Sequence, residues 1–152
     1  MKAKYHLKTW MLVIAACAIT FGAARAAEMD DFLARIGDPN ADVRAEAWKA
    51  AGPLGAPAIK PLAELAASEE PGIAKAALAA IATITAHAGR PDAADEQEAV
   101  AKALARTVEA ASEKQLRREL LHYLGLVATD AEVPLLARLL SDPDVGEDAR
   151  TA

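Results

Sequence analysis

The placement of proline and glycine is the feature that most restricts the fold of this chain. These residues cluster in short runs such as Gly37-Asp38-Pro39, Gly52-Pro53, Pro71-Gly72 and Gly89-Arg90-Pro91. The segments between the runs have helical length, and none alternates between apolar and polar residues for long enough to predict a strand. Of the 126 residues from 27 to 152, 33 are alanine, the strongest helix former. The sequence therefore predicts an all-α fold.

Apolar side chains recur at helical spacing within each segment. Leu116 and Leu120 share one face of the sixth segment, and Val133 and Leu136 share one face of the seventh. Seven helices are expected, at about 28–36, 41–51, 57–67, 72–87, 93–110, 113–127 and 131–140. An eighth begins near Val145 and is cut short where the sequence stops. We therefore expect a truncated reading frame or a piece of a longer protein.

The first 26 residues predict a secretory signal peptide. Three lysines precede an uncharged stretch over residues 9–24 with an apolar centre, and the small-x-small triplet Ala24-Arg25-Ala26 follows. The apolar run is shorter than the roughly 20 residues that a membrane-spanning helix needs. We expect cleavage after Ala26 and export to the periplasm or the extracellular space, with no stable membrane span.

The same region contains an alternative processing signal. Ile14-Ala15-Ala16-Cys17 is similar to the bacterial lipobox, in which the cysteine receives a lipid and becomes the new N-terminus. The apolar stretch continues past Cys17 through Ile19 and Phe21, where a lipoprotein usually becomes polar. Cleavage after Ala26 is therefore favoured, and a lipid anchor at Cys17 is the less favoured alternative.

Removal of the leader changes the charge and the chemistry available to the chain. Four of the 17 basic residues and the single cysteine are lost, which leaves 13 basic against 22 acidic residues and a net charge of 13 − 22 = −9. The remaining chain can form no disulfide, no thiolate metal site and no cysteine nucleophile. Because neutralisation of phosphates supplies most of the affinity for nucleic acids, an acidic domain is not expected to bind them.

Similar segments recur along the chain. Leu33-Ala34-Arg35-Ile36 matches Leu136-Ala137-Arg138-Leu139, and Leu62-Ala63-Glu64-Leu65 is a third copy. An apolar residue, followed within two positions by a basic one, opens the following helix near residues 43, 73 and 116. The period is thus about 30 residues with one longer unit, and self-similarity on this scale is typical of repeat architectures.

These segments resemble the HEAT-repeat family in its short bacterial form. The residues that carry the resemblance are Asp38-Pro39-x-x-Asp42-Val43-Arg44-x-x-Ala47, Leu54–Leu65 and Tyr123–Leu136. The resemblance implies an α-solenoid of antiparallel helix pairs over residues 27–152, with about three and a half repeats and a truncated last helix. Stacked pairs of this kind bury an apolar stripe that a single pair leaves open.

The family also has a ladder of acidic and basic residues that links adjacent units. The resemblance assigns this role to Asp42 with Arg44 and to Asp142 with Arg150. Arg117 and its counterparts at the start of the second helices are accordingly expected to be structural.

The chain offers little reactive chemistry. His87 and His122 are the only histidines after residue 26, and neither lies in a His-x-x-x-His pair or beside a glutamate. We therefore expect no metal site, no cofactor and no catalytic residue. Some HEAT-like proteins are bilin lyases, so a lyase-like enzyme is an alternative that the resemblance permits.

Trp48, Arg90 and Tyr123 are the candidate binding residues, because these residue types dominate interface hot spots. Each also has a structural interpretation. Trp48 can pack over the next repeat, Arg90 can donate to carbonyls at the end of the fourth helix, and Tyr123 can pack at a hairpin edge with its hydroxyl in water.

The expected function is a non-enzymatic protein–protein interaction or scaffold module that is exported from a bacterial cytoplasm. Its partner is an unidentified protein or peptide. The alternatives are a structural spacer within a longer protein and the lyase-like enzyme, and the choice among these rests partly on analogy at the level of the fold.

Overall fold

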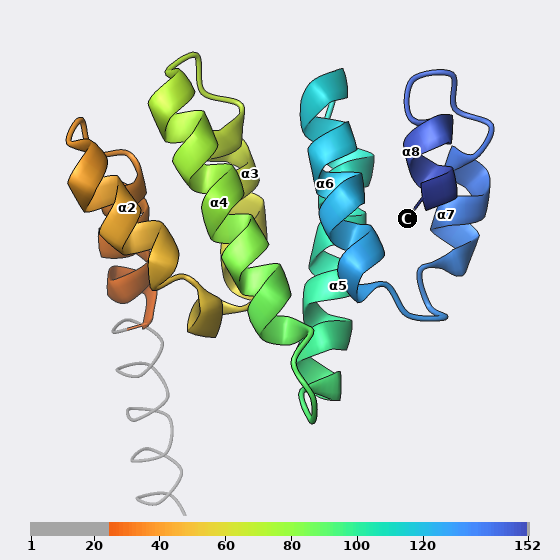
Figure 1. The fold of residues 1–152 in the computed structure, drawn as a ribbon, viewed down its shortest axis with the longest axis horizontal. Helices are drawn as coiled ribbons and strands as arrows, with labels where there is room; N and C mark the ends of the chain where they lie inside the picture. The colour runs from red at the N-terminus through yellow and green to blue at the C-terminus, as the bar shows by residue number, and fades with distance from the viewer. Residues whose placement is uncertain (1–24, 152) are drawn as a thin grey trace, which may run out of the picture. The chain divides into compact units, whose positions relative to one another are not determined.

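The structure is a computed structural model that describes residues 25–151 (Figure 1). The expected signal peptide, including Cys17, lies outside the described residues apart from its last two positions. The chain divides into two compact units, residues 1–34 and 35–152, and each is considered by itself. The described part of the first unit is helical, and this helix ends at Ile36.

The predicted all-α class is confirmed, since residues 25–151 contain helices and no strand. Each helix expected from the sequence is present close to its predicted position. After the N-terminal helix, the elements are α2 (Ala41–Lys49), η1 (Gly52–Leu54), η2 (Ala56–Ala58), α3 (Ile59–Ala66), α4 (Pro71–Ala88), α5 (Ala94–Ala110), α6 (Lys114–Val127), α7 (Val133–Leu139) and α8 (Gly146–Thr151).

The start of the third predicted helix is the main difference in boundaries. Residues 56–58 form a 3₁₀ turn, η2, and the α-helix begins only at Ile59. The preceding Gly55 has a φ of 61°, a left-handed conformation that glycine adopts without steric cost. Pro57 lies in the first turn of η2, where its missing backbone N–H costs no hydrogen bond.

The helices of the second unit pack mainly against near neighbours in the sequence. The short turns between α3 and α4 and between α5 and α6 bring each of these pairs into contact. Contacts also connect α2 with α4, α4 with α6, and α6 with α8, while α3 contacts α5 (Figure 1). None of the helices described in residues 25–151 is both long and apolar enough to cross a membrane.

The core lies between α3, α4, α5 and α6. Alanines such as Ala77 and Ala101 are fully buried, and their small side chains allow the helices to approach closely. Branched aliphatic residues fill the space between the helices, as the close packing of protein interiors requires. The large side chains of these four helices that are completely buried are Ile59, Leu62, Ile81, Ile84, Val100, Leu104, Val108, Leu120, Leu121, Leu124 and Val127.

The turns before α2 and α8 share one hydrogen-bonding pattern. The Asp38 carboxylate accepts a hydrogen bond from the backbone N–H of Asn40 at 2.7 Å, and Asp142 accepts from Asp144 at 2.8 Å. Before α4, the hydroxyl of Ser68 accepts from the N–H of Glu70 at 3.2 Å. Short polar side chains favour such turns because they satisfy a backbone donor two residues ahead.

Neither of the two ion pairs expected from the HEAT-repeat resemblance, Asp142 with Arg150 and Asp42 with Arg44, is present among the described residues. Arg150 is bound to Glu147 on its own helix, while Asp142 pairs with Arg117 of α6. Asp142 lies in the turn before α8, and packing brings α6 rather than the far end of α8 opposite its carboxylate.

The pair expected between Asp42 and Arg44 is also absent among the ion pairs of the described residues. Arg44 donates instead to the backbone carbonyls of Asp38 and Pro39, at 2.6 and 2.9 Å. Its guanidinium also lies against Gly72, where an added Cβ would be 2.8 Å from it. Arg44 therefore braces the turn before α2 against the start of α4, which is the structural role expected of it.

The face of the seventh helix that Val133 was expected to share with Leu136 is not fully buried. Val133 is 55% exposed, whereas Leu139 is buried. Val133 is the first residue of the seven-residue helix α7.

Candidate functional site

An apolar groove lies between α3 and the turn that joins α5 to α6. Its volume is about 250 Å³. Its lining consists of Lys60, Ala63, Glu64, Ala67, Thr107, Ala110, Ala111, Ser112, Glu113 and Leu116, which we call the α3–α5 groove.

The groove exists because small side chains face each other across it. Ala63 and Ala67 lie four residues apart on or next to α3, so they share one face of that helix. Ala110 ends α5 and Ala111 follows it. The buried Leu116 of α6 adds an apolar side chain to the lining.

Charged side chains surround the opening of the groove. The Lys60 ammonium lies 3.9 Å from the Glu64 carboxylate, and both side chains are largely exposed. The Glu113 carboxylate caps α6, accepting from the N–H groups of Gln115 at 3.1 Å and Leu116 at 2.9 Å. With Lys60, the groove is thus lined by two acidic side chains and one basic side chain.

Trp48 lies on α2 and is partly exposed. The Lys49 ammonium lies 5.6 Å from its ring centroid, within the distance at which a cation is attracted to an aromatic face. Trp48 does not line the α3–α5 groove.

Arg90 lies just after α4 and has the structural role expected of it. It donates to the carbonyl of His87 near the end of α4, and its guanidinium also lies 2.8 Å from the Glu96 carboxylate of α5. His87 Nε2 is 3.7 Å from the same carboxylate, and Gly52 of η1 packs against the His87 ring, to which an added Cβ would be 3.1 Å away. These residues tie the α4–α5 turn together.

Tyr123 lies on α6, half-buried, with its ring 5.6 Å from that of His122. Burial, and secondarily the nearby Glu119 carboxylate, raises the pKa of Tyr123 above its ordinary value of 10.0. Leu126, one turn further along α6, is 62% exposed. This part of α6 therefore presents aromatic and aliphatic side chains to solvent.

The structure does not bring the three sequence-predicted binding residues together. Trp48 contacts Lys49, and Tyr123 contacts His122. Arg90 contacts His87 and Glu96 on either side of the α4–α5 turn. Large side chains in the sequence do not indicate the α3–α5 groove, because alanines form much of its lining. The signal that could have found it is the set of alanines at 63, 67, 110 and 111 near the ends of two successive helices.

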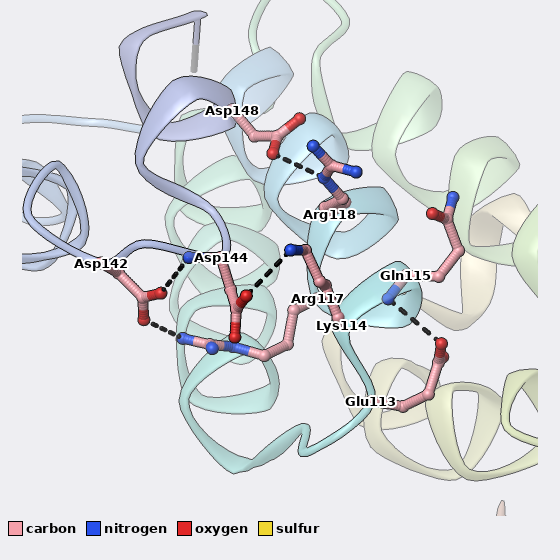
Figure 2. A network of polar contacts seen from close by, with 8 residues as sticks. All are labelled: Glu113, Lys114, Gln115, Arg117, Arg118, Asp142, Asp144 and Asp148. Carbon is pink, nitrogen blue, oxygen red and sulfur yellow. Dashed lines mark hydrogen bonds and ion pairs between the residues drawn. The ribbon is translucent and has the colours of Figure 1, made fainter.

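A second notable region is a network of ion pairs between α6 and the α7–α8 segment. Figure 2 shows three cations of α6 facing three aspartates: Lys114 with Asp144 at 2.8 Å, Arg117 with Asp142 at 3.1 Å, and Arg118 with Asp148 at 2.9 Å. Arg138 of α7 also pairs with Glu109 of α5.

The central pair of the network is the most enclosed. The side chains of Arg117 and Asp142 are 19% and 26% exposed, and the other two pairs are more open to solvent. The backbone N–H of Asp144 and the Arg117 guanidinium hold the pKa of Asp142 below its ordinary value of 3.8. The carboxylate is therefore charged at neutral pH, and its contribution to stability is lost only as the pH falls below that value.

No group of three or more histidine, cysteine, aspartate or glutamate side chains within residues 25–151 is arranged to hold a metal ion. Comparison of the chain with protein-family models, with curated proteins and with solved structures finds no match.

Proposed function

We propose that this protein is an exported, non-enzymatic interaction module of the HEAT type that binds a partner protein. We further propose that the α3–α5 groove receives an aliphatic side chain of the partner, flanked by basic residues. The observation that carries this proposal is an open apolar hollow with an acidic rim between two neighbouring helices.

The helical pairing supports the HEAT assignment. Consecutive helices pack as α3 with α4 and α5 with α6, and similar polar side chains close the turns before α2, α4 and α8. Export is supported by the order of basic, apolar and small residues in the first 26 positions.

The size of the groove favours a side chain over a small molecule. Pockets that enclose drug-sized ligands usually have volumes of about 300–1,000 Å³. The groove is smaller, at about 250 Å³, and it is open on one side. A projecting aliphatic side chain from a partner surface suits such a space.

The charges at the groove indicate which residues of the partner lie next to the bound aliphatic side chain. Glu64 and Glu113 lie at the rim with a single cation, Lys60. The chain as a whole also has more acidic than basic residues, 22 against 17. Complementary charge directs association and excludes wrong partners, so a basic flank on the partner is favoured.

The proposal can be tested by selecting binders from a random peptide library displayed on phage, with the purified protein as the target. We expect enrichment of peptides that place Leu, Ile, Val or Met next to Lys or Arg. Selected peptides are then synthesised and titrated against Ala110→Leu, which places a larger side chain in the groove from an exposed position. Burial of one aliphatic side chain contributes about 1.5–3 kcal/mol, so we expect affinity to fall about 10- to 100-fold.

Ala86→Leu is the matched control, because Ala86 is exposed on α4 and does not line the groove. This variant should bind the peptides as the wild type does. Glu64→Gln should weaken binding of the basic peptides with a smaller effect at high salt. Peptides that bind Ala110→Leu and the wild type equally would show that the groove is not the site.

A further inference from the structure

The interface between α6 and the α7–α8 segment has more ion pairs than the interfaces of α3 with α4 and of α4 with α6. Four ion pairs join α7, α8 and their connecting turn to α5 and α6. Among the described residues, no ion pair joins α3 to α4 or α4 to α6, where buried Ile, Leu and Ala side chains make the contacts. Charge thus has a larger part in docking α7–α8 than in docking the other helices.

Apolar burial in this segment is correspondingly small. From residue 133 onward the buried apolar side chains are Leu139, Val145 and Ala149, whereas α4 alone has Ala76, Ala77, Ala80, Ile81, Ile84 and Ala88. Val133 and Leu140 are exposed. Segments with few buried apolar contacts open at lower free energy than the core of a domain.

The connection to α6 is suited to movement of the segment as one body. α6 ends at Val127, and Ala128 has an extended backbone with φ −54° and ψ 144°. Beyond it, the buried Glu132 carboxylate accepts from the N–H and the hydroxyl of Thr129, at 3.0 and 2.8 Å. The turn before α7 therefore has hydrogen bonds of its own.

We infer that ion pairs of Lys114, Arg117 and Arg118 hold the α7–α8 segment on α6. The segment detaches from α6 as the ionic strength rises, while α3–α6 stay folded. Individual exposed ion pairs contribute little, but several on one interface act together. The Debye length falls from about 10 Å at 0.1 M salt to about 3 Å at 1 M. Because exposed charges are screened more than enclosed ones, salt weakens the two outer pairs before the central one.

Hydrogen exchange of the full chain, measured between 0.05 and 1 M NaCl, tests this inference. We expect exchange in α7 and α8 to accelerate about five-fold or more across this range because of screening, relative to exchange in α4. Equal acceleration in all helices, or no acceleration in α7 and α8, would overturn the inference.

Charge reversal provides the second test at low salt. Arg118→Asp places two negative charges together at a partly exposed pair and should open α7–α8 without disturbing the core. The double variant Arg118→Asp with Asp148→Arg restores opposite charges and should recover most of the protection. Lys60→Glu breaks an exposed pair within α3 and should leave exchange in α8 unchanged. Failure of the double variant to restore protection would mean that packing, and not charge, docks the segment.

Discussion

At the scale of single residues, the basic side chains at the start of α2 and α6 have related positions. Arg44 reaches the carbonyls of the turn before its own helix and lies against Gly72 of α4, and Arg117 reaches Asp142 in the turn before α8. Each side chain links its helix to an element further along the chain. Arg44 and Arg117 therefore both make structural contacts, and those of Arg44 differ from the pair with Asp42 that was expected.

Tyr123 allows a titration that reports on its surroundings. In a Tyr5→Phe variant Tyr123 is the only tyrosine of the chain. Its absorbance change on ionisation should have a midpoint above pH 10.0, because burial and Glu119 disfavour the phenolate. Glu119→Gln should lower the midpoint and leave it above 10.0, since burial is the larger cause.

The sign of the accompanying stability change follows from the same shift. Because the folded state holds the phenol proton more tightly than the unfolded state, stability is unaffected below pH 10.0 and falls as the pH rises through the higher, folded value. A midpoint at or below 10.0 in the folded Tyr5→Phe variant, verified as folded by circular dichroism, would contradict the half-buried position of Tyr123.

At the scale of elements, the short helices α7 and α8 depend on a tight turn between them. A Cβ added at Gly146 would lie 2.7 Å from the backbone carbonyl oxygen of Leu140. A backbone atom cannot move aside as a flexible side chain can, so the start of α8 requires glycine at this position.

Gly146→Ala should therefore destabilise the α7–α8 segment. Overpacking of this kind costs about 1–3 kcal/mol, and faster hydrogen exchange in α8 should report it. Gly89→Ala is the matched control, because its Cβ would meet neighbours at ordinary contact distances of 3.5 Å or more. If exchange in α8 is the same in both variants, the turn is looser than the structure describes.

At the scale of the whole molecule, the second unit of the chain has one continuous apolar core across α3–α6. Leu120 is fully buried in it, while Leu126 on the same helix is 62% exposed. Two identical truncations on α6 can therefore separate burial from helix propensity.

Leu120→Ala should reduce the free energy of unfolding by about 2–5 kcal/mol, as expected for a cavity in a packed core. Leu126→Ala should change it by no more than about 0.5 kcal/mol. Urea unfolding followed by circular dichroism measures both. Similar losses in the two variants would argue against the placement of α6 in the core.

Much of the fold could be predicted from the sequence by local rules. Proline and glycine runs mark where helices end, and apolar spacing of three and four residues marks the faces that become buried, such as Leu116, Leu120 and Leu124. These signals depend on neighbouring residues alone, so the all-α class and the helix positions were correct. The predicted start of the third helix differs from the structure, in which η2 replaces its first turn. The spacing of apolar residues does not indicate this turn, because it depends on the backbone conformation at Gly55 and Pro57.

The candidate site and the ion pairs depend on contacts between residues far apart in the sequence. The α3–α5 groove forms only when Ala63 and Ala110 face each other across two packed helices. The partner of Asp142 is Arg117, 25 residues away, and not Arg150, because packing of α8 on α6 sets the distance between the charges. Local sequence determined which segments become helices, whereas tertiary packing decided which side chains meet, because charge and cavity energies depend on separation in space.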